Sequence, residues 1–296
     1  MKRHPISPED MEKTFLSKNE CLFPSISLDI EFEMNIKGND LTRYHTAYHV
    51  EEKLKDRLKV DYVFTNHGSE CVIRQIIEHL VIDQECKYWV IPQPTFELAR
   101  FYADHYGCTV ESPQYIYTDD FDLNLDIDYP QDKVLYMVSP HNPTGLTLTY
   151  EDIDELCNKY KYVIIDEAYI RPDESVMIQR ENLILVRTFS KMGGITGLRF
   201  GLGICFDKYL YEGFVQTRPM YMNSITLKYV DYILDNFITN QIEQRMKDKL
   251  SELDPLKIVA KAGNFVLFKN IDTYDGYELK EYDFNGHKFY RMTLHE

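Results

Sequence analysis

One lysine stands between a serine and an arginine in the glycine-rich stretch TFSKMGGITGLRFG, residues 188–201. A lysine amine can act as a nucleophile and can form a Schiff base with a carbonyl compound. The flanking hydroxyl of Ser190 and the guanidinium of Arg199 are groups that bind phosphate. Lys191 is therefore a candidate nucleophile beside a phosphate site, and an exposed lysine in a glycine-rich turn is the alternative.

Other polar residues follow two strands that the sequence predicts before Lys191. One apolar run leads into SPHNPTG, whose prolines and glycine favour a rigid turn that carries Asn142. The next apolar run leads into Asp166 and Tyr169, and a carboxylate in that place needs a positive or donating partner. In a parallel sheet the carboxyl ends of the strands form the ligand-binding edge. We therefore expect these side chains to converge near Lys191, although Asn142 could cap a turn and Tyr169 could pack in the core.

A candidate anion site lies earlier in the chain. A short strand over residues 62–65 runs into His67 and Gly68, and a helix follows that carries Ser69 and Glu70 near its start. The N–H groups at a helix start point at whatever lies above the turn, which suits an anion. Capping of the helix by Ser69 is an equally good explanation.

The order of these elements indicates the fold class. Strands alternate with helices from residue 62 to residue 205. This alternation predicts an α/β protein with a mostly parallel central sheet that helices cover on both faces. Before the first strand, a charged helix is expected to place Tyr48, Leu54 and Leu58 on one side.

Composition excludes several classes of function. The chain has 296 residues and a formal charge of -15, which argues against binding to nucleic acid or to an anionic membrane surface. Six cysteines show neither a Cys-x-x-Cys pair nor zinc-type spacing with histidine, so we expect reduced thiols, no metal site and a cytoplasmic protein. No signal peptide and no membrane-spanning run is recognisable.

The motifs together resemble those of a known family. SPHNPTG resembles its Asn-Pro-x-Gly loop, DEAY at 166–169 its cofactor-nitrogen motif, and SKMGGITGLRFG its Schiff-base lysine with the following arginine. The chain thus resembles the fold-type I pyridoxal-phosphate (PLP) enzymes, in particular the class I/II aminotransferases, and is most similar to the histidinol-phosphate aminotransferase group. The likeness runs from about residue 43 to residue 291. It implies an aspartate-aminotransferase-like fold with a large PLP-binding domain, residues 35–210, and a shortened small α+β domain, residues 1–34 and 211–296.

The resemblance also implies a role for each motif residue. Lys191 would hold PLP as a Schiff base and move a proton at the substrate's α carbon. Asp166 would pair with the ring nitrogen, while Asn142 and Tyr169 would donate to the ring's phenolic oxygen. The implied phosphate ligands are Ser69, Glu70, Ser190 and Arg199.

Four further residues match family positions outside these motifs. Phe96 takes the place of the aromatic residue that stacks on the cofactor ring. Tyr44 resembles a tyrosine that reaches the cofactor phosphate of a neighbouring subunit, which implies a homodimer with shared active sites. Arg291 resembles the arginine that binds the substrate's carboxylate or phosphate, and Lys269 stands where a second arginine is common.

The resemblance implies an aminotransferase that takes a small-molecule amino donor and a keto acceptor. A PLP-dependent decarboxylase shares every cofactor residue named above, and a compact non-catalytic relative is a third reading. Two departures bear on the substrate. The segment 271–287 is shorter than usual, and the Asn-Glu-Asn-Pro stretch that lines the family's pocket is not recognisable around residues 33–39.

Overall fold

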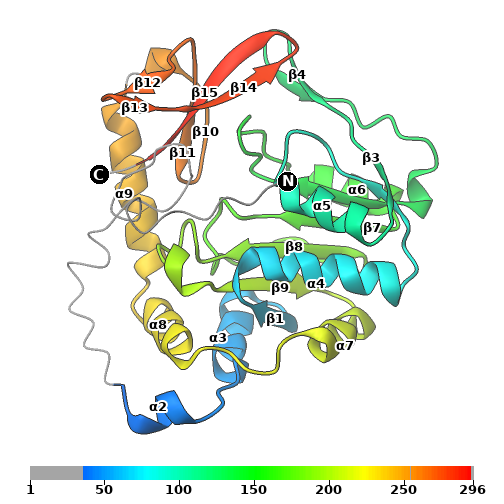
Figure 1. Cartoon of the computed structure of the whole chain (residues 1–296), viewed down its shortest axis with the longest axis vertical. Helices are drawn as coiled ribbons and strands as arrows, with labels where there is room; N and C mark the ends of the chain where they lie inside the picture. Colours follow the sequence, from blue (N-terminus) through cyan, green and yellow to red (C-terminus); the bar gives the residue numbers. More distant parts are fainter. Residues whose placement is uncertain (1–35, 254, 295–296) are drawn as a thin grey trace.

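The computed structural model describes residues 36–253 and 255–294, shown in colour in Figure 1. The amino-terminal part of the expected small domain and Cys21 lie outside the described residues. Within them, Cys86, Cys108, Cys157 and Cys205 are free thiols. No helix in the described part of the chain is both long and apolar enough to cross a membrane.

A seven-stranded sheet forms the centre of the molecule. The strand over Gly201–Cys205 is antiparallel to both of its neighbours, and the other strand pairs of this sheet are parallel. The sheet is therefore mostly parallel, as predicted. Its central strands are apolar runs with both faces buried, as expected for a parallel sheet covered on two sides. The strand order is β1 (Tyr62–Asn66), β9 (Gly201–Cys205), β8 (Leu183–Thr188), β7 (Tyr162–Asp166), β6 (Val134–Val138), β2 (Tyr88–Val90) and β3 (Thr109–Glu111).

Helices cover both faces of this sheet (Figure 1). Successive residues of one strand point to opposite faces, and Ile164 and Ile165 of β7 accordingly belong to two different buried clusters. The cluster around Ile164 includes side chains of α4 (Gly68–Ile82), α5 (Glu97–His105) and α7 (Lys208–Thr217). The cluster around Ile165 includes side chains of α3 (Tyr48–Leu58), α6 (Tyr150–Lys159), α8 (Ser224–Asp235) and α9 (Ile238–Glu252), and the short α2 (Gly38–Thr42) precedes α3.

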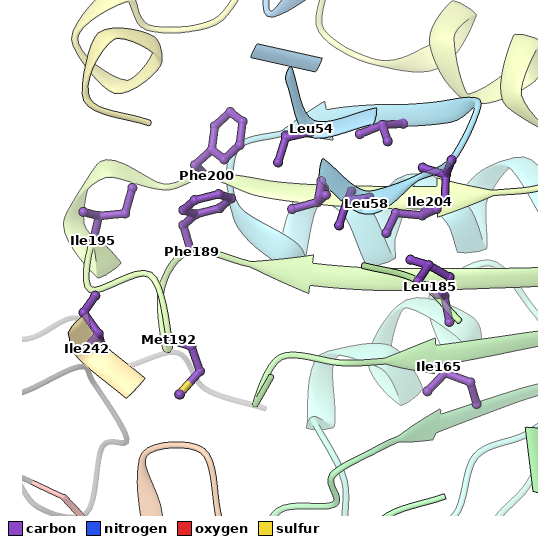
Figure 2. Close-up of a cluster of buried hydrophobic side chains, with 14 of the residues drawn as sticks. Leu54, Leu58, Ile165, Leu185, Phe189, Met192, Ile195, Phe200, Ile204 and Ile242 are labelled. Carbon is purple, nitrogen blue, oxygen red and sulfur yellow. The ribbon is translucent and has the colours of Figure 1, made fainter. Parts of the chain in front are cut away.

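The apolar side of α3 differs in one residue from the prediction. Leu54 and Leu58 are fully buried, and Figure 2 shows both beside the sheet. Tyr48 is 67% exposed, so its assignment to the buried side was wrong. The buried stripe instead begins at Val50, and two residues along a helix turn a side chain by about 200°.

A second, antiparallel sheet lies above the carboxyl ends of the central strands (Figure 1). Two of its strands, which contain the segments FVLFK and FYRMT, pair with each other, with Leu267 opposite Arg291. A hairpin of β4 (Tyr115–Tyr117) and β5 (Phe121–Leu123) packs against this sheet through a small aromatic cluster. The sheet order is β10 (Ile258–Ala262), β11 (Phe265–Lys269), β15 (His287–Thr293) and β14 (Lys280–Phe284), and β12 (Thr273–Tyr274) pairs with β13 (Tyr277–Glu278).

Candidate active site

Three adjacent strands bring the motif residues to one edge of the central sheet. β6, β7 and β8 are parallel neighbours, and Asp166 lies in register with Val138 on one side and with Val186 on the other. Asn142 follows β6, Asp166 ends β7, and Lys191 follows β8. The convergence expected from the sequence is therefore what the sheet produces.

A cavity of about 430 Å³ opens at this edge. It is lined by the motif residues of all three strand ends, by the start of α4, and by residues of β14 and β15. Every site residue expected from the sequence lines it except Tyr44 and Lys269. The expected residues in the lining are Ser69, Glu70, Phe96, Asn142, Asp166, Tyr169, Ser190, Lys191, Arg199 and Arg291.

The turn that carries Lys191 is fixed by the apolar side chains around it. Figure 2 shows Phe189, Met192, Ile195 and Phe200 together on this side of the sheet, and each is at most 7% exposed. The rings of Phe189 and Phe200 meet edge to face with their centroids 5.3 Å apart. Because its neighbours in the chain are buried, Lys191 is held at the cavity by a backbone that packing fixes.

The carboxylate of Asp166 is buried in the cavity lining and is held by two donors. The hydroxyl of Tyr136 on β6 donates to its Oδ2 at 2.7 Å, and the N–H of Ala168 donates to its Oδ1 at 3.1 Å. Burial raises the pKa of Asp166 to about 6, against the hydrogen bond from Tyr136 and the charge of Lys191, which lower it. A buried carboxylate of this kind is suited to a cationic N–H partner, which would restore its ionised form.

Four other polar side chains of the cavity lining form a connected group. Asn142 Nδ2 donates to the hydroxyl of Tyr169 at 2.5 Å. Arg291 Nη1 donates to Asn142 Oδ1 at 3.2 Å and to the hydroxyl of Tyr282 at 3.3 Å. Burial raises the pKa of Tyr169 to about 12, although the charge of Arg291 opposes the rise. Tyr169 is therefore a neutral hydroxyl at physiological pH and can donate a hydrogen bond.

The part of the cavity lining formed by the start of α4, Ser190 and Arg199 has the features of a phosphate site. Helix α4 begins at Gly68, and His67 is its N-cap, so Ser69 is not the capping residue. A Cβ at Gly68 would lie 2.5 Å from Arg199 Nη2, and the φ of Gly68 is +81°. Arg199 Nη1 in turn donates to Ser190 Oγ at 3.3 Å. A helix start, a hydroxyl and a guanidinium thus meet around a backbone position that only glycine can fill.

Tyr44 and Lys269 do not line this cavity. The ring of Tyr44 is 81% exposed and stacks on Tyr221 with 4.4 Å between the centroids. The ammonium of Lys269 lies 4.7 Å from the centroid of the Tyr117 ring, and Phe289 lies opposite Lys269 on β15. Lys269 therefore contacts the aromatic cluster between β4 and the antiparallel sheet and does not line the cavity.

The sequence reading missed two tyrosines that contact the expected residues. Tyr136 stands inside an apolar strand, and its partner Asp166 is identified only when the register of β6 against β7 is known. A buried tyrosine hydroxyl usually needs a partner, which is the one signal the sequence offered. Tyr282 lies on β14, in the segment that no motif covers, and it lines the cavity beside Arg291.

Comparison with known proteins gives a consistent result over most of the chain. Residues 13–292 match the family model "Aminotransferase class I and II". The histidinol-phosphate aminotransferase of Ruminiclostridium cellulolyticum is 31% identical over 242 residues, which are 73% of this chain and 65% of that enzyme. Histidinol-phosphate aminotransferase 2 of Archaeoglobus fulgidus is 30% identical over 279 residues, which are 88% of this chain and 79% of that enzyme.

Solved structures show the same fold. Histidinol-phosphate aminotransferase from Sinorhizobium meliloti, in complex with pyridoxal-5'-phosphate, has a TM-score of 0.76 at 17% identity and covers 99% of this chain and 91% of its own. L-threonine-O-3-phosphate decarboxylase from Porphyromonas gingivalis has a TM-score of 0.73 at 18% identity and covers 96% of this chain and 95% of its own. At these identities the likeness concerns the fold alone.

Proposed function

Because the chain belongs to the class I and II aminotransferases and has the fold-type I architecture of PLP-dependent transferases, we propose that it is itself a PLP-dependent aminotransferase. It would transfer an amino group between an amino acid or phosphorylated amine and a keto acid, as a histidinol-phosphate aminotransferase does. The observation that carries the proposal is the meeting of Lys191 and Asp166 at adjacent strand ends in a cavity that Arg199 and Arg291 also line.

The residues present fit the cofactor. Ser190, Arg199 and the start of α4 would hold its phosphate, and the glycine at 68 leaves room for the guanidinium there. Asp166 would accept the ring N–H, and Asn142 and Tyr169 would donate to the phenolic oxygen. When bound, PLP supplies a ring that withdraws electrons from the α carbon of the substrate. The residues proposed to hold the phosphate and the residues proposed to contact the ring line one cavity.

Each residue of the chain then has a part in the reaction. The amine of Lys191 would bind the cofactor and would afterwards take a proton from the substrate's α carbon and give it to the cofactor carbon that had carried the aldehyde. Asp166 would keep the ring nitrogen protonated, because a cation beside it favours its ionised form. Tyr136 would hold Asp166 in place through the hydrogen bond to Oδ2.

Arg291 is the group proposed to select the substrate. It is 6% exposed, and its Nη1 donates to Asn142 and to Tyr282, which fixes the direction of the guanidinium. A planar guanidinium can bind a carboxylate or a phosphate with two parallel hydrogen bonds. Since Lys269 does not line the cavity, we assign the substrate's anionic group to Arg291 alone.

We further propose that the protein is a cytoplasmic homodimer that takes part in amino-acid biosynthesis. In the homodimer Tyr44 would reach the cofactor phosphate of the other subunit. The ring of Tyr44 stacks on Tyr221 and is exposed, and a residue that contacts the site of another subunit needs such exposure in the single chain.

A donor and acceptor panel tests the proposed reaction. Purified protein with PLP is incubated with single amino acids and phosphorylated amines, with and without keto acids, and the products are identified by mass. The expected result is a cofactor band that shifts on addition of one donor, together with a keto product from that donor. Release of carbon dioxide without a keto product would show a decarboxylase instead. No band shift with any donor would favour a non-catalytic relative.

A further inference from the structure

The proposed function leaves one buried ionisable side chain beside the cavity without a role, that of His141. It directly precedes Asn142 in the loop after β6 and is 1% exposed. Its Nδ1 lies 2.8 Å from Thr144 Oγ1, and its Nε2 lies 2.8 Å from the carbonyl oxygen of Pro94. The ring also stacks on Tyr115, with 3.8 Å between the centroids and 19° between the planes. His141 thus has a partner on each ring nitrogen and on a ring face.

The partners determine which ring nitrogen carries the proton. A carbonyl oxygen only accepts, so the contact with Pro94 requires a proton on Nε2. In the neutral ring Nδ1 then carries no proton and accepts from the hydroxyl of Thr144, whose oxygen in turn accepts from the N–H of Leu146 at 3.3 Å. The hydrogen bonds therefore run in one direction, from Leu146 through Thr144 and His141 to Pro94. A neutral ring satisfies all of them, in agreement with a pKa that burial lowers to about 4.

This chain of hydrogen bonds joins two segments of the cavity wall that are far apart in the sequence. His141 and Pro94 are separated by 47 positions. Next to His141 stands Asn142, which donates to Tyr169, and two residues after Pro94 stands Phe96. The face that stacks on Tyr115 adds a third segment, because Tyr115 belongs to the aromatic cluster of the antiparallel sheet.

We propose that His141 is a positioning residue that holds the Asn142 loop and the Phe96 segment at the separation that a bound cofactor ring requires. The cofactor part of this inference rests on the proposed function. Phe96 would stack on one face of the ring and Asn142 would donate to its oxygen, so an error in their separation affects both contacts. The link from Nε2 to Pro94 is the part that spans the two segments.

Two substitutions separate this link from the rest of the side chain. In His141→Gln the amide nitrogen can reach the place of Nε2 and keep the bond to Pro94. In His141→Asn the shorter side chain reaches only the place of Nδ1, so it keeps Thr144 and loses Pro94. Thr144→Val is the matched control, because it removes the bond to Nδ1 and leaves the link to Pro94 in place.

Hydrogen exchange of the cofactor-free protein tests the link without any cofactor. We expect faster exchange over residues 93–100, on the far side of the link, in His141→Asn than in the wild type, with His141→Gln and Thr144→Val close to the wild type over the same residues. Equal exchange in all four proteins, or equal acceleration in all three variants, would overturn the positioning role. A wild-type protein that fails to bind PLP would refute the proposed function and leave this readout intact.

Cofactor titration then tests the consequence. PLP binding is measured by absorbance, and the position of the cofactor band is recorded for each protein. We expect His141→Asn to bind PLP about tenfold more weakly, which is the loss of about one buried hydrogen bond, and to shift the band. His141→Gln should restore both properties. Wild-type affinity and an unshifted band in His141→Asn would contradict the inference.

Discussion

At the scale of single residues, burial changes the protonation of Asp166, which is 4% exposed. Burial raises its pKa from 3.8 to about 6, so the folded chain without cofactor holds a proton that the unfolded chain has lost. Between these two values the native state binds more protons than the unfolded state, so its stability falls as pH rises. The stability contributed by the protonated carboxyl is therefore fully present below about pH 4 and lost above about pH 6.

The pH dependence of the free energy of unfolding of the cofactor-free protein should show that Asp166 is protonated in the folded chain. At about 1.4 kcal/mol per pKa unit, the free energy of unfolding of the wild type relative to Asp166→Asn should fall by about 2 kcal/mol from pH 4 to pH 7. Urea unfolding of both proteins across this range measures the difference. Asp56→Asn, at an exposed position on α3, is the control and should run parallel to the wild type. Parallel curves for Asp166→Asn as well would mean that the carboxyl is ionised in the folded chain.

Lys191 gives the second residue-scale prediction. Borohydride fixes a Schiff base between a lysine and an aldehyde, so the wild-type protein treated with PLP should keep the label through denaturation. Lys191→Ala should lose at least nine tenths of the label, since it removes the only amine expected to react. Peptide mapping by mass spectrometry locates the label. Label that persists in the variant would assign the covalent bond to a different lysine.

At the scale of elements, the start of α4 offers a matched pair of glycines. Gly68 and Gly107 have similar backbone angles, with φ at +81° and +76°. A Cβ at Gly68 would meet Arg199 Nη2 at 2.5 Å, whereas a Cβ at Gly107 would meet nothing within 4 Å. Substitution by alanine therefore strains the backbone equally at both positions and disturbs the guanidinium at only one.

Gly68→Ala and Gly107→Ala should both lower the free energy of unfolding, by about 1 kcal/mol from backbone strain. Only Gly68→Ala should weaken PLP binding as well, by about tenfold or more, because it displaces one charge-assisted contact to phosphate. Titration with PLP and with pyridoxal, which lacks the phosphate, separates the two effects. An equal loss of affinity for both compounds in Gly68→Ala would show that the phosphate lies elsewhere.

The elements also show how far the sequence alone could go. The strand ends carrying Asn142, Asp166 and Lys191 were predictable, because apolar runs followed by polar turns indicate where buried strands stop. Tyr136 was not, because its contact with Asp166 depends on which strands are neighbours and in what register. Lys269 shows the converse, since its position in the sequence suggested the cavity and the packing of β11 directs it to Tyr117.

At the scale of the whole molecule, the site depends on contact between the two sheets. A Cβ at Gly263, in the turn between β10 and β11, would lie 2.7 Å from the backbone oxygen of Tyr169, so this turn packs closely on the cavity wall. We propose that the chain is divided into a large domain, residues 35–210, and a small domain, residues 1–34 and 211–296. Within the latter range α7 packs on the central sheet, where Phe214 stacks on Phe64 at 4.6 Å.

The proposed homodimer with shared active sites predicts that two inactive variants can recover activity when their subunits are mixed. If Tyr44 serves the partner's site, Tyr44→Ala and Lys191→Ala damage different sites of a mixed dimer. The subunit with an intact Lys191 would then receive an intact Tyr44 from its partner, and one site of that dimer would be whole. An exchanged equal mixture of the two variants should therefore recover about a quarter of the wild-type activity, because half of the dimers are mixed and each has one whole site.

The matched control for this experiment pairs Lys191→Ala with Asp166→Asn. Both residues line the same cavity of one chain, so a mixed dimer of these variants has no whole site and should recover nothing. Subunit exchange is confirmed for both mixtures by native mass spectrometry, and activity is followed with the donor that the panel identifies. Recovery of activity in the control would mean that the partner subunit contributes Lys191 or Asp166 to the site, in addition to Tyr44. Absence of recovery with Tyr44→Ala, when mixed dimers are present, would place Tyr44 outside the partner's site and leave its exposed ring on Tyr221 as a packing contact.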